Sequence, residues 1–310
     1  MNDLPLDFYE KICVVGCSSR CTDTPHLFKE LRHIAGSFGV FAQRMFDSCC
    51  YCSFVIRRNS IRMNRVKKYS QHQDIRNLSN LRDFYIAWVT ITFEDGDALN
   101  VDHDIAERVR YIRSRHRESR WCLQMDSPII SEQWAECLST WKLHCLTICT
   151  ELQESSLELC KRIVEKGALT KLLLCYDITD ESRDSVELAK SALLQERFTS
   201  LYIRSRSPLT EIIDFWRVNA HRLSGKDVLF DGKYQSVTHM YNDFRLCNEE
   251  DWIPIEKRYA YFPRTLFDIP SRPRCLNFDG RSNEKEHNMF MFYDSAICDT
   301  VTNTIGLLFT

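Results

Sequence analysis

A pattern of hydrophobic residues recurs four times between residues 143 and 230. The copies begin at positions 143, 169, 198 and 225, so successive starts lie 26, 29 and 27 residues apart. In each copy one residue separates the last two apolar residues, and this alternation predicts a short strand with one buried face. The last copy is degenerate, because Gly225 takes its first position and would also end the helix before it. The copies are Leu143-x-x-Leu146-x-Ile148, Leu169-x-x-Leu172-x-Leu174, Phe198-x-x-Leu201-x-Ile203 and Gly225-x-x-Val228-x-Phe230.

Apolar residues at helical spacing follow each of the first three strands. We expect the first helix to open with a capping box formed by Ser155 and Glu158 and to end at Gly167. The third helix is expected to open with Ser207-Pro208 as an N-cap and first-turn pair. The residues expected on the buried faces of the three helices are Leu157, Cys160, Ile163 and Val164; Val186, Ala189 and Leu193; and Leu209, Ile212, Ile213, Trp216, Ala220 and Leu223.

Strand–helix units of this length fall within the period of leucine-rich repeats. A single unit of this kind cannot close its own core, so neighbouring units stack. The asparagine expected three residues after the last leucine is replaced by Glu151, Asp177 and Arg206, which cannot form the same internal ladder with the backbone. The sequence therefore predicts an α/β fold, which is either a leucine-rich-repeat-like strand–helix solenoid or an ordinary parallel α/β sheet.

Residues 1–48 are expected to form a short helical module. Leu4-Pro5 opens a segment with Phe8 and Ile12 at near-helical spacing, and a polar stretch then separates it from a second apolar stripe. Gly36 and Gly39 argue against one unbroken second helix. The second stripe consists of Leu27, Leu31, Ile34, Phe38, Phe41 and Phe46.

Residues 49–140 are expected to be a mixed α/β connecting region. Segments 51–56 and 85–93 are rich in β-branched and aromatic residues, which predicts two strands. Segment 104–119 predicts a short, strongly charged helix.

Residues 141–310 are expected to form the leucine-rich-repeat-like α/β recognition domain. Its last part, 231–310, is irregular and punctuated by prolines. Two late apolar runs, 289–293 and 305–309, predict strands that could close the sheet.

Composition and charge narrow the possible functions. The chain of 310 residues has only 9 glycines and contains no GxGxxG, Walker A or GxSxG motif, which disfavours nucleotide binding and hydrolysis through those motifs. The net charge of −2 excludes a globally basic nucleic-acid binder. No apolar run reaches the roughly 18 residues that span a bilayer, and the first residues lack the features of an export signal. We therefore expect a cytoplasmic or nuclear protein with reduced cysteines, away from membranes.

Candidate catalytic and metal-binding chemistry is sparse. Cys49-x-x-Cys52 has the spacing of zinc ligands, and together with Cys17 and Cys21 it could supply four of them. Buried cysteines that act as small apolar residues are the favoured alternative. The histidines form no HExxH pair and no serine stands in a nucleophile elbow. The sequence thus predicts a protein that is not an enzyme and that needs no cofactor.

Two basic runs, 57–68 and 108–120, could contact phosphates. Residues 1–125 carry 19 bases and 15 acids, a surplus of only four. A solvated surface or a site for an acidic partner is therefore favoured, and nucleic-acid binding through these runs is the less favoured alternative.

The N-terminal segment resembles an F-box. Residues 4–12, Leu-Pro-Leu-Asp-Phe-Tyr-Glu-Lys-Ile, parallel the family's opening LPxE followed by an apolar residue and a helix, and residues 27–42 are similar to its second helical stripe. Residues 212–216 and 223–226 are similar to a helix-then-strand unit in the C-terminal domains of the divergent F-box proteins of nematodes.

This resemblance implies the substrate-recognition subunit of a cullin-type ubiquitin ligase. The F-box would present Leu4, Pro5, Phe8 and Ile12 to a hydrophobic groove on a Skp-family adaptor. The repeat domain would hold a target protein. The alternative is a protein-interaction scaffold with no ligase link, in which residues 1–48 cap the repeats.

Overall fold

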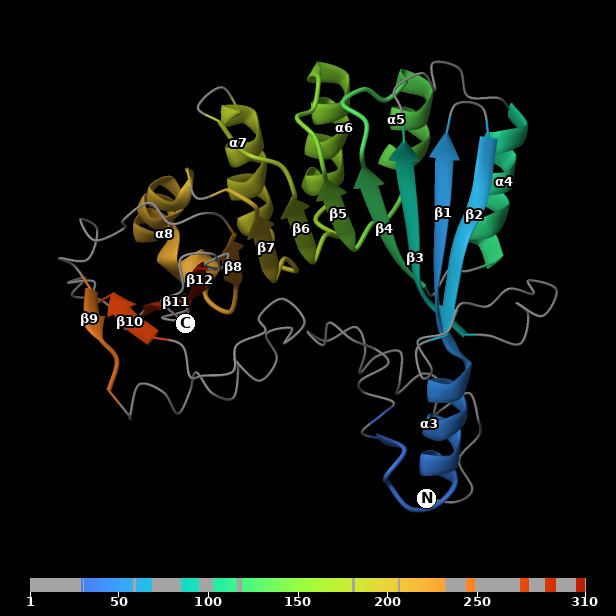
Figure 1. Cartoon of the computed structure of the whole chain (residues 1–310), viewed down its shortest axis with the longest axis horizontal. Coiled ribbons are helices and arrows are strands. Elements are labelled where there is room, and N and C mark those ends of the chain that lie inside the picture. The colour runs from blue at the N-terminus through green and yellow to red at the C-terminus, as the bar shows by residue number, and fades with distance from the viewer. Residues whose placement is uncertain are drawn as a thin grey trace, which may run out of the picture. The chain divides into compact units, whose positions relative to one another are not determined.

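The computed structural model describes an α/β fold, as the sequence predicts (Figure 1). It separates into two units, residues 1–159 and 160–310, and each is described by itself. The described residues are residue 29 and residues 31–57, 60–68, 85–94, 103–115, 119–179, 182–205, 207–231, 244–248, 274–278, 288–293 and 305–309.

The first unit contains strands in the order β2-β1-β3-β4-β5. β1 pairs antiparallel with β2, whereas β1, β3, β4 and β5 run parallel to one another. The elements are α3 (Ser37–Ser48), β1 (Cys49–Arg57), β2 (Ser60–Lys68), β3 (Tyr85–Glu94), α4 (His103–Arg115), β4 (Arg120–Met125), α5 (Glu132–Ser139), β5 (Cys145–Ile148) and α6 (Glu154–Glu165), within which the unit boundary falls.

The second unit contains strands in the order β6-β7-β8-β12-β11-β10-β9. β6, β7 and β8 are parallel, and the remaining pairs are antiparallel. The last strand of the chain, β12, therefore pairs with the last repeat strand. The elements are β6 (Lys171–Leu174), α7 (Arg183–Leu193), β7 (Ser200–Ile203), α8 (Leu209–Leu223), β8 (Asp227–Phe230), β9 (Phe244–Leu246), β10 (Arg274–Phe278), β11 (Met289–Tyr293) and β12 (Ile305–Phe309).

The repeat pattern in the sequence sets the register of the second unit. Leu172 pairs with Leu201, and Leu201 pairs with Val228, so equivalent positions of successive repeats stand side by side. All three side chains are fully buried. The predicted strands of the repeats are thus confirmed, and their apolar residues form the core, because alternate side chains of a strand point to the same face.

In the first unit, apolar side chains of the strands also form the core, and aromatic residues contribute to it. Phe93 of β3 meets Trp134 of α5 edge-to-face, with ring centroids 5.3 Å apart. β4 and α5 were not predicted from the sequence. Leu123 of β4 stands beside Leu146 of β5 in register, but the position three residues before Leu123 is Arg120 instead of a leucine, which hides the repeat.

Two helix starts differ from the prediction. α6 begins at Glu154, so Ser155 lies inside the helix, and its hydroxyl donates to the carbonyl of Ile130 over 3.5 Å. The predicted capping box is wrong, because this hydroxyl is bonded outside the helix. α8 begins one residue later than expected, with Pro208 as the N-cap, and the hydroxyl of Ser207 donates to the carbonyl of Ile178.

The second N-terminal stripe is interrupted, and α3 begins only after Gly36, which has φ +89°. Gly39 makes a close approach possible: a Cβ there would lie 1.8 Å from the carbonyl oxygen of Ile34. Phe41 and Phe46 of α3 are buried against Leu31, Phe38 and Met45. Helix α3 ends at Ser48, and its C-cap, Cys49, is already the first residue of β1. The expected boundary of the N-terminal module, after residue 48, therefore coincides with a helix–strand junction without a linker.

The two late apolar runs form β11 and β12, as predicted, and β12 extends the sheet from β8. β2 was not predicted, because its polar sequence carries no clear periodicity. Among the described residues, no helix combines the length and apolar character needed to cross a membrane.

Candidate protein-interaction face

The strands β6, β7 and β8 have one buried face and one face that is largely half-buried. The burial pattern alternates along β6 and β7, with the repeat leucines inward and the residues between them outward. We call the outward side the outer face of the second unit. Its side chains are Lys171, Leu173, Ser200, Tyr202, Arg204, Asp227, Leu229 and Asp231.

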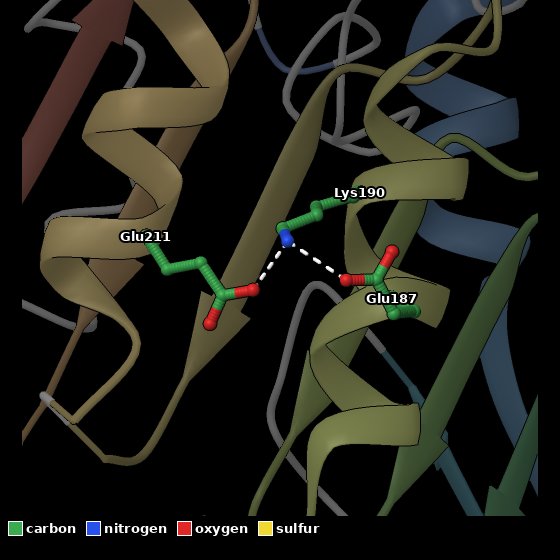
Figure 2. A network of polar contacts seen from close by, with 3 residues as sticks. All are labelled: Glu187, Lys190 and Glu211. Atoms are coloured by element: carbon green, nitrogen blue, oxygen red, sulfur yellow. Dashed lines mark hydrogen bonds and ion pairs between the residues drawn. The ribbon is translucent and has the colours of Figure 1, made fainter.

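Helices α7 and α8 lie on the other side of these strands. Trp216 of α8 stacks on Phe309 of β12, whose side chain shares the face of the buried Val228. α7 is tied to α8 by Lys190, whose ammonium group donates to Glu187 on its own helix and to Glu211 on α8 (Figure 2). In the described part of the second unit, both helices therefore cover the inner face only.

The Lys190 contact holds the helical layer in place. The ammonium group lies 2.8 Å from Glu187 Oε1 and 6.0 Å from the ring centroid of Phe215 on α8. Burial alone would lower the pKa of Lys190, but the hydrogen bonds and charges of Glu187 and Glu211 outweigh it and raise the pKa above the usual value. Lys190 therefore stays charged at neutral pH and links two consecutive repeats.

A second lysine, Lys226, connects the layers at the start of β8. Its ammonium group donates to the carbonyl oxygens of Leu193 and Gln195 at the C-terminal end of α7. Cations are favourable at that end of a helix, because its last carbonyls lack partners within the helix. Burial, and then the charge of Arg222, lower the pKa of Lys226 to about 8.

Hydrogen bonds between side chains cross the outer face from β7 to β8. The hydroxyl of Ser200 donates to Asp227 Oδ2 over 2.7 Å, and the hydroxyl of Tyr202 donates to Asp231 Oδ2 over 3.1 Å. Burial, and then the negative charge of Asp231, raise the pKa of Tyr202, so this phenol stays protonated and remains a donor. The ring of Tyr202 is thereby fixed over the middle of the face.

Charged groups on the outer face are not all neutralised. Arg204 and Asp231 follow β7 and β8 in adjacent positions of the ladder, but no ion pair joins them, and Arg204 Nη1 instead donates to the carbonyl of Cys175 over 3.3 Å. Asp231 Oδ1 is buried, and no group among the described residues donates a hydrogen bond to it. An acceptor of this kind is costly unless a donor reaches it.

The accessible part of the outer face lies over β6 and β7 and the end of β8. Towards β12 and β11 this face is closed: Leu229 of β8, Leu308 of β12 and Phe290 of β11 are buried, with exposed fractions of at most 4 %. Arg204 is exposed, whereas Lys171 and the remaining members on β6 and β7 are half-buried. A partner would therefore meet charged and aromatic groups first.

The corresponding face of the first unit carries small polar side chains. Cys122 of β4 stands beside Cys145 of β5, and Thr147 Oγ1 lies 3.9 Å from the sulfur of each. The hydrogen bond with Cys145 and burial raise the pKa of Cys122, so this thiol is not an activated nucleophile. Burial also raises the pKa of Cys160 to about 12.

The residues predicted to bind an adaptor, Leu4, Pro5, Phe8 and Ile12, lie outside the described residues, as do the candidate ligands Cys17 and Cys21.

The other candidate metal ligands, Cys49 and Cys52, are both buried in β1. Three residues apart in one strand, they point to opposite faces and cannot converge on one ion. In the part of the chain that the structure describes, no three His, Cys, Asp or Glu side chains are grouped around a possible metal site.

The two basic runs occupy different elements. In the first, Arg57 is exposed at the end of β1, and residues 60–68 form β2. The second is divided between α4 and β4. Arg113 of α4 lies 5.0 Å from the ring centroid of Trp141, and burial lowers its pKa. The second run therefore does not lie on a single element.

The members of the outer face were not predicted from the sequence. A signal was present, because Leu173, Tyr202 and Leu229 occupy the same position in successive repeats, between the last two apolar residues. Comparisons of this chain with models of protein families, with curated proteins and with solved structures find no match.

Proposed function

We propose that this chain is a non-enzymatic protein-interaction protein that serves as the substrate-recognition subunit of a cullin-type ubiquitin ligase. In this proposal, an F-box-like segment binds a Skp-family adaptor and a leucine-rich-repeat-like domain binds the target. The observation that carries it is the outer face of β6–β8, where register-matched side chains of successive repeats line a strand surface away from α7 and α8.

The geometry of the repeats supports the recognition half of the proposal. Stacked strand–helix units with their helices on one side present the strands as an extended binding surface in solenoid proteins. Tyrosine and arginine are enriched in protein interfaces, and here Tyr202 of β7 and Arg204, just after β7, both belong to that surface. The polar contacts between Tyr202 and Asp231 hold the surface in one arrangement before a partner arrives.

The adaptor half rests on the resemblance of residues 4–12 to an F-box. Its support in the described residues is the apolar cluster around Phe41 and Phe46, which gives the end of the N-terminal module a small core of its own. Such a core would hold a preceding helix in position for a groove on the adaptor.

The test is recovery of a Skp-family adaptor co-expressed with the tagged full-length chain. The variant Leu4→Ala/Phe8→Ala/Ile12→Ala should lose the adaptor, while Val218→Ala, which changes a side chain that is 77 % exposed on α8, should retain it. Thermal unfolding of both variants shows whether the fold is intact. Equal adaptor recovery from the triple variant and the unaltered chain, or none from either, would overturn the ligase assignment.

The second candidate is an interaction scaffold with no ligase link, in which residues 1–48 cap the fold. The direct junction of α3 with β1 favours it, because a cap must be continuous with the elements that it covers. It predicts that the triple variant lowers the melting temperature and that the unaltered chain recovers no adaptor. The ligase assignment predicts a nearly unchanged melting temperature and adaptor binding by the unaltered chain.

A further inference from the structure

We infer that helix α4 carries a binding site for an acidic protein segment, formed by Arg110 and Arg113 beside α5. Carboxylate side chains of the segment pair with the two guanidinium groups. The site lies within the first unit, so it is an interaction surface separate from the outer face of the second unit. It does not depend on the ligase assignment.

Arg110 and Arg113 converge on one place. They stand three residues apart in α4, so their side chains are neighbours on the surface of the helix. Both act on the thiol of Cys137 in α5: burial raises the pKa of Cys137, whereas the charges of the two arginines and a hydrogen bond with the Arg110 side chain lower it. Burial has the larger effect, so Cys137 is a neutral thiol at neutral pH and supplies no negative charge to the arginines.

Among the described residues, no carboxylate forms an ion pair with Arg110 or Arg113. Glu136 of α5 is near enough to influence the pKa of Cys137, but it is not paired with either arginine. Basic residues on the helices of the second unit differ, because Lys190 and Arg217 each have a carboxylate partner. The two guanidinium groups on α4 are therefore available to an acid from another protein.

Trp141 holds Arg113 in an orientation that leaves its donors available. The guanidinium carbon of Arg113 lies 5.0 Å from the centroid of the Trp141 ring. A guanidinium group contacts a ring through its flat face, while its N–H groups point outward in its plane, where a carboxylate can accept two hydrogen bonds. The ring of Trp141 is only 2 % exposed, so no nucleic-acid base can stack on it, which favours a protein segment as the partner.

A partner can reach both arginines. Arg110 is exposed, and Arg113 is half-buried. Burial lowers the pKa of Arg113, because its charge has lost part of its hydration. Opposite charges attract more strongly where water is partly excluded, so a carboxylate gains more at Arg113 than at a fully solvated arginine.

The test is a titration of a fluorescently labelled peptide of alternating glutamate and glycine with the full-length chain, followed by fluorescence anisotropy. The double variant Arg110→Gln/Arg113→Gln should weaken binding about tenfold, because it removes both charge-assisted contacts. The matched control, Lys166→Gln/Arg217→Gln, removes two positive charges from exposed positions elsewhere and should leave the affinity nearly unchanged. Thermal unfolding shows whether each variant is folded.

Two single variants keep the inference testable if the double variant does not fold. Arg110→Gln changes an exposed side chain and should weaken peptide binding by itself. Arg113→Lys keeps the positive charge but loses the planar contact with Trp141 and the paired donors, so it should also weaken binding. Unchanged affinity in both single variants would overturn the inference.

Three further outcomes would also overturn it. The first is equal weakening by the double variant and its control, and the second is a lack of peptide binding by the unaltered chain. The third is tighter binding of a labelled oligouridine than of the peptide through the same arginines, which would assign the site to nucleic acid. The titration needs no adaptor, and the adaptor test changes only residues 4–12, so failure of either leaves the other result standing.

Discussion

The ammonium group of Lys226 donates a 2.8 Å hydrogen bond to the backbone carbonyl of Gln195, 31 residues earlier in the chain. Gln195 follows the C-terminal end of α7, in the second copy of the repeat, and Lys226 immediately precedes β8, in the fourth, so the bond spans the copy between them. Lys226 is a buried residue, with 5 % of its surface exposed. This position makes the protonation of Lys226 part of the stability of the second unit.

The lowered pKa of Lys226 predicts a specific dependence of stability on pH. Its pKa is about 8 in the folded chain against an ordinary value of 10.5. Between these values the unfolded chain binds the proton and the folded chain does not, so the contribution of this group to the free energy of unfolding rises with pH, by at most about 1.4 kcal/mol per pH unit. Below pH 8 both states are protonated and the contribution is constant.

Urea unfolding of the unaltered chain and of Lys226→Met at pH 7, 8, 9 and 10 measures this contribution. The difference in unfolding free energy between the two should change little from pH 7 to 8 and then move in favour of the unaltered chain. A difference that stays constant up to pH 10 would contradict the lowered pKa. Other lysines, cysteines and tyrosines titrate equally in both proteins and cancel in the difference.

Two adjacent leucines of β6 test the one-sided burial of the repeats. Leu172 is fully buried on the inner face, and Leu173 is half-buried on the outer face. Leu172→Ala should lower the free energy of unfolding by about 2–5 kcal/mol, the usual cost of a cavity in a core. Leu173→Ala should cost less than about 1 kcal/mol, because it leaves no enclosed cavity. Urea unfolding measures both, and similar costs would show that both faces are equally packed.

Gly39→Ala in α3 tests the close approach of the Ile34 carbonyl. Helix propensity alone predicts that alanine stabilises a helix interior by about 1 kcal/mol relative to glycine. The added Cβ would lie 1.8 Å from the oxygen of Ile34, so we expect the sign to reverse and the melting temperature to fall. Ser37→Ala, at the start of the same helix, is the control and should have little effect. A higher melting temperature for Gly39→Ala would mean that the carbonyl moves away freely.

Lys190→Met tests the contact between α7 and α8. The variant removes the bonds to Glu187 and Glu211, whose side chains are 63 % and 48 % exposed, so the loss should be only about 0.5–1 kcal/mol. Because the pKa of Lys190 is raised, its contribution is fully present below the unfolded pKa near 10.5 and constant between pH 6 and 9. Thermal unfolding at low and high salt is the measurement, and the loss should shrink at high salt. Lys166 is exposed just after α6, and Lys166→Met is the control that should leave the free energy of unfolding unchanged. An equal loss of stability in both variants would show that the contact between α7 and α8 does not stabilise the chain.

The strands of the repeats were predictable from the sequence because their signal is local. Burial of alternate residues in β6, β7 and β8 leaves a period of two in the sequence. Equivalent positions of successive copies, Leu172, Leu201 and Val228, then pair with one another in the sheet. Gly167, with φ +63°, follows the end of α6 for a similar local reason, since a left-handed residue after a helix favours glycine. The start of α6 was not predictable, because Ser155 has a partner, Ile130, in another segment.

By itself, then, the sequence determined the class of fold, the apolar residues of the core and the late strands β11 and β12. Only the tertiary structure decided that β12 pairs with β8, that Lys226 binds the end of α7, and that Tyr202 and Asp231 share one face. The physical reason is that burial leaves a periodic trace along the chain. A polar contact between residues about 30 positions apart leaves none, because it depends on which strands become neighbours.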